Sequence, residues 1–325
     1  SYPFSQMYSP SQNLSTKEVD FWCGNQPNKI FHGDCSLAII YQIAPFVNIE
    51  KFDIFNKNGL GSTTNFIKNL EQIIDKNYEL VYFGCNIFEP VFGQEKKEIQ
   101  KLLKSIPYSV VPIGNNMNER TKISFLPQCL EIPFDVGSYD KQYHTSFFSM
   151  YEPGLGPKIL APGERISFYA NEEAYEVSGT SFSAAIITGF MALLLSEFGS
   201  KFSKQELLLV IYFCTQKTND FQKALLGVID MRSVLFYLHV LHDIKGKISK
   251  KNYKKKFEYY LTLVHTFNNH IELQIMPKTV HDLVHEIASA MRAFEQKKFY
   301  YKDMFDKKQF FLLKELQNKN FKYLQ

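Results

Sequence analysis

The chain has 325 residues and a hydrophobic content of 45%, which allow one large or two ordinary domains with a substantial core. Its five cysteines are scattered, odd in number and without CxxC spacing, which argues against a disulfide framework and against a zinc site. The net charge is only +4, but an acidic part of the chain precedes a strongly basic one.

The N-terminal region carries no basic and apolar signal segment, and residues 1–15 are expected to form a tail. Together with the scattered cysteines, this pattern favours a reducing, cytoplasmic compartment. The first expected element is a strand through Val19, Phe21 and Trp22, which are good strand formers. Asp20 lies within this strand.

A histidine precedes the first expected helix, in the sequence Phe31-His32-Gly33-Asp34-Cys35. Its ordinary pKa lies near neutrality, so an imidazole can exchange protons at physiological pH. The adjacent Gly33 lets the backbone pass close to a reacting group. Six of the eight histidines lie in the Lys-rich C-terminal stretch, where a surface position is the default. His32 is therefore the candidate general base.

Strands and helices alternate through the first half of the chain. The hydrophobic spacing predicts helices at 37–43, 64–76 and 96–105 and strands within 44–55, at 78–83 and at 109–113. This alternation predicts an α/β fold with a mostly parallel sheet and helices on both of its faces. Active sites in such sheets gather at the carboxyl ends of the strands.

The last of these strands ends in Gly114-Asn115-Asn116. An asparagine at a strand end can direct its amide N–H groups at a developing oxyanion. Asparagine-rich strand ends also form ordinary turns. The pattern alone leaves both interpretations open.

The segment Gly179-Thr180-Ser181-Phe182 opens an apolar stretch that continues to Leu195. A serine in the first turn of a helix lies near unpaired backbone N–H groups and the positive end of the helix dipole, which suits a nucleophile. It equally suits an ordinary N-cap. Small and polar residues within the stretch, and Glu197 soon after it, favour a buried helix over a membrane span.

Taken in order, the His-Gly block, the strand with Gly-Asn and the Gly-Thr-Ser helix resemble the subtilisin-like serine proteases (subtilases). Three further segments follow the family's run between its oxyanion asparagine and its nucleophile: residues 136–140, 146–149 and 159–166. The most recognisable element there is Ala161-Pro162-Gly163, and Gly227-Val228-Ile229-Asp230 resembles the strand that closes the family's catalytic domain. The resemblance covers residues 16–236 and implies a subtilisin-like catalytic domain.

The resemblance implies a role for each block. Ser181 would attack the substrate carbonyl, His32 would take its proton, and Asn115 would bind the oxyanion. The expected substrate is a protein or peptide, and no cofactor or metal is implied. The family's substrate-pairing strand usually ends in Ser-Leu-Gly-Gly. In the equivalent segment here only Gly84 survives. Gly84 and the strand-end glycine Gly114 are the expected substrate-binding positions.

The triad aspartate is where the chain departs from the family. The family's first core strand normally ends in Asp-Ser-Gly or Asp-Thr-Gly, and no such tripeptide precedes His32. Asp20 is the best candidate. A shifted alignment instead places Cys23-Gly24 at this position and leaves the triad incomplete. Asp34 is a third candidate, but it lies too close to His32 in sequence to reach the far ring nitrogen easily.

The composition changes after the catalytic domain. Residues 237–325 hold 17 Lys and Arg against nine Asp and Glu, with the densest cluster at Lys250–Lys256. Apolar residues recur there at helical spacing, for example at Leu283 and Ile287. We expect a basic α-helical extension packed on the catalytic domain. Its basic face fits an anionic partner or simply a solvated surface.

The sequence therefore predicts a serine endopeptidase that works through an acyl-enzyme on Ser181. The competing interpretation is a non-catalytic binding module that keeps the scaffold but has lost the aspartate. A third interpretation is a protease with a narrow duty, such as trimming one precursor or leader peptide. A carboxylate within hydrogen-bond reach of the second nitrogen of His32 favours an enzyme over a binding module.

Overall fold

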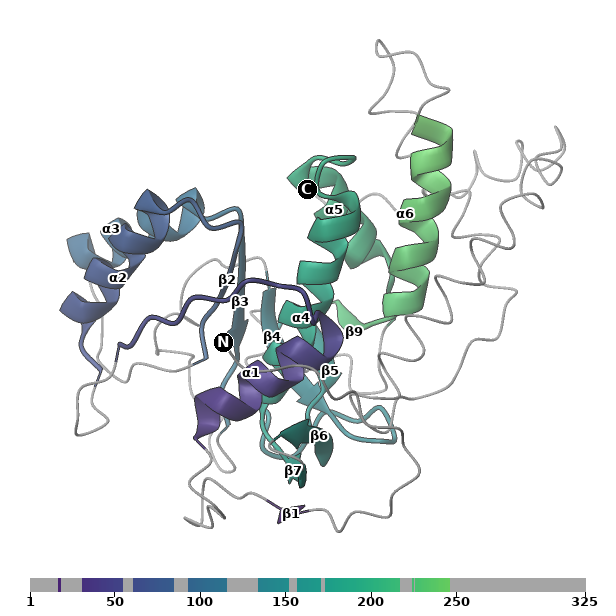
Figure 1. Ribbon diagram of the computed structural model, residues 1–325, viewed down its shortest axis with the longest axis horizontal. Helices are drawn as coiled ribbons and strands as arrows, with labels where there is room; N and C mark the ends of the chain where they lie inside the picture. Colours follow the sequence, from purple (N-terminus) through teal and green to yellow (C-terminus); the bar gives the residue numbers. More distant parts are fainter. Residues whose placement is uncertain are drawn as a thin grey trace, which may run out of the picture.

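The computed structural model describes residues 17–18, 31–54, 61–84, 93–115, 134–151, 157–170, 173–216, 224 and 226–245. Its centre is a six-stranded sheet in the order β2-β3-β4-β5-β9-β8 (Figure 1). The strands are β2 (Leu80–Tyr82), β3 (Tyr108–Pro112), β4 (Phe134–Tyr139), β5 (Ile159–Pro162), β9 (Gly227–Ile229) and β8 (Thr215–Gln216). All neighbouring strands are parallel except for the pair β9 and β8, which is antiparallel.

Helices cover both faces of this sheet. On one face lie α1 (His32–Ile43), α4 (Thr180–Phe198), α5 (Lys204–Phe213) and α6 (Met231–Lys245), and on the other lie α2 (Thr63–Asp75) and α3 (Gly93–Ser105). Successive side chains of a strand point to opposite faces. Accordingly, Val110 of β3 packs into the first helical cluster and Val111 into the second. The predicted α/β fold, with a mostly parallel sheet between helices, is confirmed.

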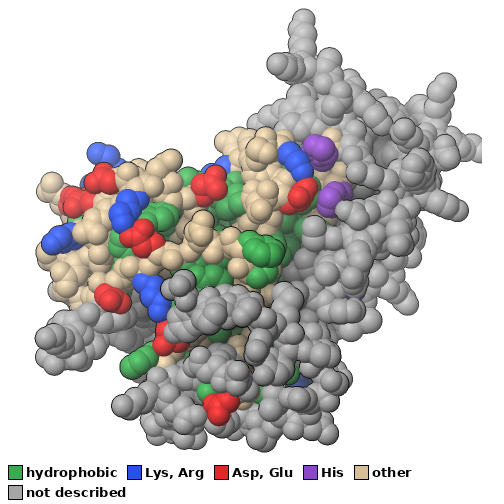
Figure 2. Space-filling model, in the orientation of Figure 1, with side chains coloured by type: hydrophobic (Ala, Val, Ile, Leu, Met, Phe, Trp, Pro, Cys, Tyr) green, Lys and Arg blue, Asp and Glu red, His purple; other side chains and the backbone are tan. Residues whose placement is uncertain are grey.

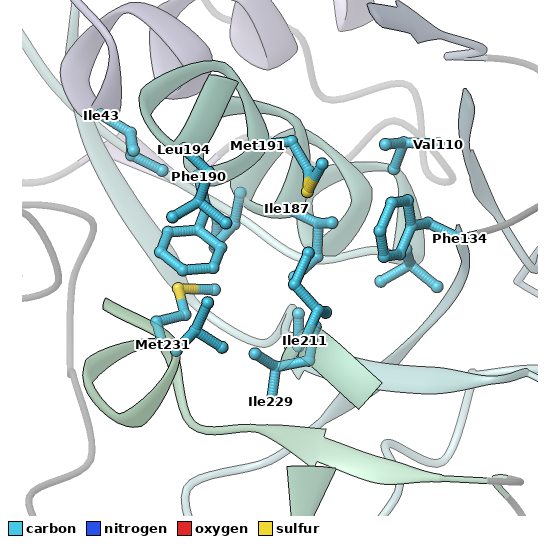
Figure 3. Close-up of a cluster of buried hydrophobic side chains, with 14 of the residues drawn as sticks. Ile43, Val110, Phe134, Ile187, Phe190, Met191, Leu194, Ile211, Ile229 and Met231 are labelled. Carbon is cyan, nitrogen blue, oxygen red and sulfur yellow. The ribbon is translucent and has the colours of Figure 1, made fainter. Parts of the chain in front are cut away.

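The larger core forms around α4, which lies against strands β2, β3, β4 and β5 and against helices α1 and α6. Figure 3 shows its side chains interlocking: Ile43, Val110, Phe134, Ile187, Phe190, Met191, Leu194, Ile211, Ile229 and Met231. Each fully buried side chain of this kind contributes about 1.5–3 kcal/mol relative to exposure. Among the described residues, α4 is the one helix long and apolar enough to cross a membrane by length and composition, and most of it is buried inside the protein.

The smaller lobe formed by α2 and α3 lies apart from α5 and α6 (Figure 1). Ser62 caps α2 by accepting a hydrogen bond from the backbone nitrogen of Asn65. The buried side of the lobe is apolar, with Phe66 and Leu70 of α2 packed in one cluster with Ile99 of α3. Figure 2 shows acidic and basic side chains interspersed over its outer surface, as is typical of a solvated amphipathic pair.

A second, three-stranded sheet has the order β1-β7-β6. β6 (Ile166–Ala170) and β7 (Glu173–Val177) form an antiparallel hairpin. β1 (Lys17–Glu18) pairs in parallel with β7, so the described part of the N-terminal segment joins this hairpin and not the central sheet.

The strand predicted within residues 44–55 is wrong, because residues 44–54 form no strand in the structure. The alternating apolar residues are divided between two cores. Val47 and Ile49 pack against the larger cluster, whereas Phe52 and Ile54 pack against the α2–α3 cluster. The alternation of apolar and polar residues therefore arises here because the segment packs between two hydrophobic clusters, and not because it pairs with a neighbouring strand.

Helix α6 runs through the expected domain boundary between residues 236 and 237. Its side chains on the far side of that position still belong to the larger core, with Tyr237, Leu238 and Leu241 almost fully buried. The packed core therefore continues at least to Leu241. The remainder of the expected basic extension, from residue 246 onward, lies outside the described residues.

Candidate active site

Ser181 lies in the first turn of α4 but does not cap it. The N-cap residue is Gly179, which has φ 151° and makes no side-chain capping bond. By contrast, Ser203 caps α5 in a full capping box with Glu206. The interpretation of Ser181 as an ordinary N-cap is therefore wrong. Within the described part of the chain, no acceptor is found for the Ser181 backbone N–H, which remains available at the positive end of the helix.

The Gly114-Asn115 strand end binds the beginning of α4 through two reciprocal hydrogen bonds. The backbone nitrogen of Gly114 donates to Thr180 Oγ1 at 3.2 Å, and the backbone nitrogen of Thr180 donates to Asn115 Oδ1 at 2.8 Å. Positive φ angles at Gly114 (109°) and Gly179 (151°) form the two bends that make this approach possible. The Gly114-Asn115 segment therefore ties the end of β3 to the start of α4.

These bonds fix the orientation of the Asn115 amide. A backbone N–H can only donate, so the oxygen of the amide must face Thr180 and the amino group must face away from it. Nδ2 lies 3.5 Å from the position that a Cβ on Gly179 would occupy. Asn115 thus presents an N–H donor beside Gly179, the N-cap residue of α4.

His32 is the first residue of α1, and its ring packs against Phe182, the residue after Ser181. The two ring centroids are 5.3 Å apart, with the ring planes inclined by 41°. Burial lowers the pKa of His32 below its usual value, so the imidazole is neutral and able to accept a proton at neutral pH. The structure therefore brings the N-terminal turns of α1 and α4 together.

Close packing of the two helices depends on Gly189. A Cβ on Gly189 would lie 2.8 Å from Cβ of Ile43 and 3.3 Å from the carbonyl oxygen of Ile40. Any side chain there would push α1 away from α4. Since His32 is on one helix and Ser181 on the other, this contact helps to set their separation.

Tyr82 connects these two helices at the end of β2. Its hydroxyl lies 3.0 Å from the carbonyl oxygen of Ser181 and 3.1 Å from Oγ of Ser36, in the second turn of α1. Tyr82 belongs to the strand that was expected to pair with substrate, but nothing in the sequence indicates this contact. Thr180 was likewise not singled out, although it stands inside the Gly-Thr-Ser block.

The candidates for the third catalytic group are placed differently. Asp20 and Cys23 lie outside the described residues, so the expected position of the aspartate stays a prediction. The carboxylate of Asp34 accepts a hydrogen bond from Lys51 Nζ at 3.0 Å and forms an ion pair with it. Asp34 is thus engaged on the side of α1 that faces the following segment.

Cysteine and metal chemistry find little support among the described residues. Cys35, three positions after His32, is a free and buried thiol, and burial raises its pKa to about 12. A thiol with such a pKa stays protonated at neutral pH and is a poor nucleophile. No three His, Cys, Asp or Glu side chains in the described part of the chain gather where they could hold a metal ion.

Comparison with known proteins gives one family match. A family model described as the subtilase family matches residues 25–224, which is more than half of the chain. Comparison with curated proteins gave no match.

Solved structures with similar folds include three proteases. The crystal structure of a lanthipeptide protease has a TM-score of 0.53 and 18% identity, with 68% of this chain and 80% of that chain covered. The prenylagaramide maturation protease PagA has a TM-score of 0.47 and 22% identity, with 57% of this chain and 71% of that chain covered. A cold-adapted subtilisin-like serine proteinase has a TM-score of 0.46 and 19% identity, over 56% and 66%.

Proposed function

Because the chain belongs to the subtilase family of serine proteases, we propose that it is an endopeptidase with Ser181 as nucleophile and His32 as general base. The observation that carries the proposal is the hydrogen bond from Thr180 N to Asn115 Oδ1, which fixes the amide with its oxygen on Thr180 and leaves Nδ2 as a donor beside Gly179, the N-cap of α4. A nucleophile alone would be weak evidence. A serine, a neutral histidine and an oriented amide donor in one place are a catalytic arrangement.

The proposed reaction proceeds in two halves. Ser181 Oγ attacks the carbonyl carbon of the scissile peptide bond while His32 takes the hydroxyl proton, and the carbonyl oxygen becomes an oxyanion. The C–N bond then breaks, and His32 returns the proton to the leaving amine. Water attacks the resulting ester of Ser181 by the same route and releases the carboxylic acid.

Two N–H groups are suited to stabilise the oxyanion. Asn115 Nδ2 is one, and the backbone N–H of Ser181 is the other, assisted by the dipole of the 19-residue helix that begins one residue earlier. Each donor is held by main-chain structure before the substrate arrives. Such pre-oriented donors stabilise the charge that develops in the transition state more than they stabilise the substrate.

We propose a peptide substrate that pairs with the backbone near Gly84. In the described sheet, β2 has a neighbour on one side only, so its other edge offers main-chain hydrogen-bonding groups. Gly84 lies two residues beyond the end of β2, and Gly114 lies two residues beyond the end of the neighbouring strand β3. An extended peptide on this edge would pass the first turn of α4.

For the third group we propose Asp20 as the carboxylate that orients His32. The support comes from the sequence alone, through the resemblance of the segment before the histidine block. If Asp20 does not reach His32, the chain is the catalytically impaired, subtilase-like binding module instead. Peptide binding without turnover would identify that alternative.

The test is hydrolysis of a mixed peptide library by the wild type, by Ser181→Ala and by Ser183→Ala. Ser183 is a matched control, because its buried hydroxyl has no hydrogen-bond partner among the described residues and lies on the same helix. We expect cleavage by the wild type and Ser183→Ala, and none by Ser181→Ala. Cleavage of short peptides without digestion of casein would indicate a narrow substrate range. Cleavage by Ser181→Ala at the wild-type rate would refute the proposal.

We further propose that the basic stretch beyond residue 245 influences partner choice without taking part in bond cleavage. The support is its charge, with the run Lys254-Lys255-Lys256 at its densest part. Replacing these three lysines by Glu should weaken salt-sensitive binding to heparin, used as an anionic probe, and leave peptide hydrolysis unchanged. Loss of hydrolysis in a folded variant would contradict this division of roles.

A further inference from the structure

Tyr82 stands where three segments meet: β2, α1 and the start of α4. It is the last residue of β2 and pairs with Val110 of β3. Its ring extends along the strand over Gly84. A Cβ on Gly84 would lie 2.9 Å from Cε1 of the ring and 3.3 Å from its hydroxyl oxygen. Glycine at position 84 therefore makes room for Tyr82, in addition to any role in binding substrate.

The hydroxyl of Tyr82 lies between the N-terminal parts of the two helices that carry the reacting groups. Its proton is shared between the carbonyl oxygen of Ser181 at 3.0 Å and Ser36 Oγ at 3.1 Å. Ser36 in turn donates to the carbonyl oxygen of His32 at 3.3 Å. A short chain of hydrogen bonds thus runs from the backbone of Ser181 to the backbone of His32 through Tyr82.

This chain of hydrogen bonds acts on position alone. Its hydrogen bonds end on the main-chain carbonyl groups of Ser181 and His32. Transfer of a proton between those groups requires them to stay within hydrogen-bond reach, and an error of about 1 Å can cost as much as 10²-fold in rate. Gly189 sets the helix separation farther along α1 and α4, whereas Tyr82 acts at the ends where chemistry takes place.

We propose that Tyr82 is a positioning residue. Its hydroxyl sets the distance between Ser181 and His32, and its ring links this reacting pair to the substrate strand at Gly84. The inference rests on the proposed function, because it assigns no reacting group of its own. A peptide paired near Gly84 would lie beside the ring that holds both helices. Correct seating of substrate and correct alignment of the reacting pair would then depend on the same side chain.

The test variant is Tyr82→Phe, which keeps the ring over Gly84 and removes only the hydroxyl. Tyr78→Phe is the matched control, since its hydroxyl donates to Glu50 at an exposed site in the same region of the chain. We expect Tyr82→Phe to lower kcat about 10- to 100-fold while KM changes less than about twofold. Tyr78→Phe should retain wild-type values. Both variants should keep the wild-type circular dichroism spectrum.

A second variant gives a readout that a merely structural residue would not produce. Ser36→Ala should lower kcat in the same direction, and the double variant Tyr82→Phe/Ser36→Ala should be no slower than Tyr82→Phe alone, because both changes interrupt one chain of hydrogen bonds. If Tyr82→Phe does not fold, the inference is tested by Ser36→Ala alone: a lower kcat supports it and an unchanged kcat overturns it.

Three results would overturn the inference: an unchanged kcat in folded Tyr82→Phe, a rise in KM alone, or fully additive effects in the double variant. An active wild type with any of these leaves the proposed function standing. A wild type without activity, or an active Ser181→Ala variant, would overturn the proposed function and this inference with it.

Discussion

Asn115 and Thr180 are held together by a 2.8 Å hydrogen bond from the backbone nitrogen of Thr180 to the side-chain oxygen of Asn115. The residues are 65 positions apart in the chain, one at the end of β3 and the other at the start of α4. The bond leaves the Asn115 amide only one orientation, with its oxygen on the Thr180 N–H and its donor nitrogen beside Gly179. In the proposed mechanism, this orientation prepares an electrostatic site before any substrate binds.

Removing the Asn115 donor should slow the reaction without unfolding the protein. We expect Asn115→Ala to lower kcat by about 10²–10³, which is the range given for the loss of one side-chain oxyanion donor in subtilisin, a member of the same family. Asn115→Asp retains an acceptor for the Thr180 N–H but has no donor, so it should be impaired at least as strongly. Steady-state kinetics on a cleaved peptide measures both. A wild-type kcat in Asn115→Asp would show that the acceptor alone matters.

The second of the two reciprocal hydrogen bonds, from the Gly114 N–H to Thr180 Oγ1, should contribute to the stability of the fold. Thr180→Val removes the hydroxyl that accepts from the Gly114 N–H in a fully buried setting. Leaving that N–H without a partner should lower the free energy of unfolding by about 1–3 kcal/mol, measured by urea denaturation. Thr180→Ser keeps the hydroxyl acceptor, so its free energy of unfolding should stay close to that of the wild type. Destabilisation by Ser but not by Val would instead point to packing of the methyl group, which Val retains and Ser lacks.

The burial of His32 predicts the acid limb of the pH profile. Burial lowers the pKa of His32, so the neutral base persists to lower pH and kcat/KM should fall with a midpoint below about 6.5. Phe182→Ala opens one side of the imidazole to water, so its midpoint should move upward toward 6.5. The midpoint reports this shift even if the variant is slower. A midpoint that does not move would mean that Phe182 contributes nothing to the burial.

The same pKa shift has a consequence for stability. The unfolded chain takes up a proton on this histidine more readily than the folded chain does. The contribution of His32 to the free energy of unfolding is therefore complete above the unfolded pKa of about 6.5 and decreases as the pH falls below it. Urea denaturation between pH 7.5 and 5 should show less of this decrease in His32→Gln than in the wild type.

How much of this site the sequence could predict depends on how local each signal is. His32, Asn115 and Ser181 each stand in a short block beside a strand end or helix start, so their placement follows from element order in an α/β sheet. Tyr82 is different, because its role requires three segments to meet at residues 36, 82 and 181. Nothing in the local sequence specifies such a meeting.

The two differences from the expected fold have similar causes. Alternating apolar residues between 47 and 54 satisfy the period of a strand, yet a period describes burial and cannot tell a hydrogen-bonded neighbour from two packed clusters. The expected boundary at residue 236 followed the change in charge. The apolar face of α6 continues past it to Leu241, because charge marks the surface and apolar spacing marks the core.

Asp20 and Asp34 offer a direct comparison for the third catalytic group. If Asp20 orients His32, Asp20→Asn should lower kcat by up to about 10⁴, as in the known triads, with little change in stability. Asp34→Asn is the matched control, since the Asp34 carboxylate pairs with Lys51 on the exposed side of α1, and it should leave kcat near the wild-type value. The reverse ranking would assign the role to Asp34. Full activity in both variants would show that neither carboxylate orients His32.

The most direct measurement of the central claim is the reaction of the purified protein with a fluorophosphonate, followed by intact mass spectrometry and peptide mapping. The account predicts one adduct per chain, located on Ser181, with labelling retained in Ser183→Ala and abolished in Ser181→Ala and in His32→Ala. An adduct on another residue, or equal labelling of Ser181→Ala, would contradict the assignment of Ser181 as the nucleophile.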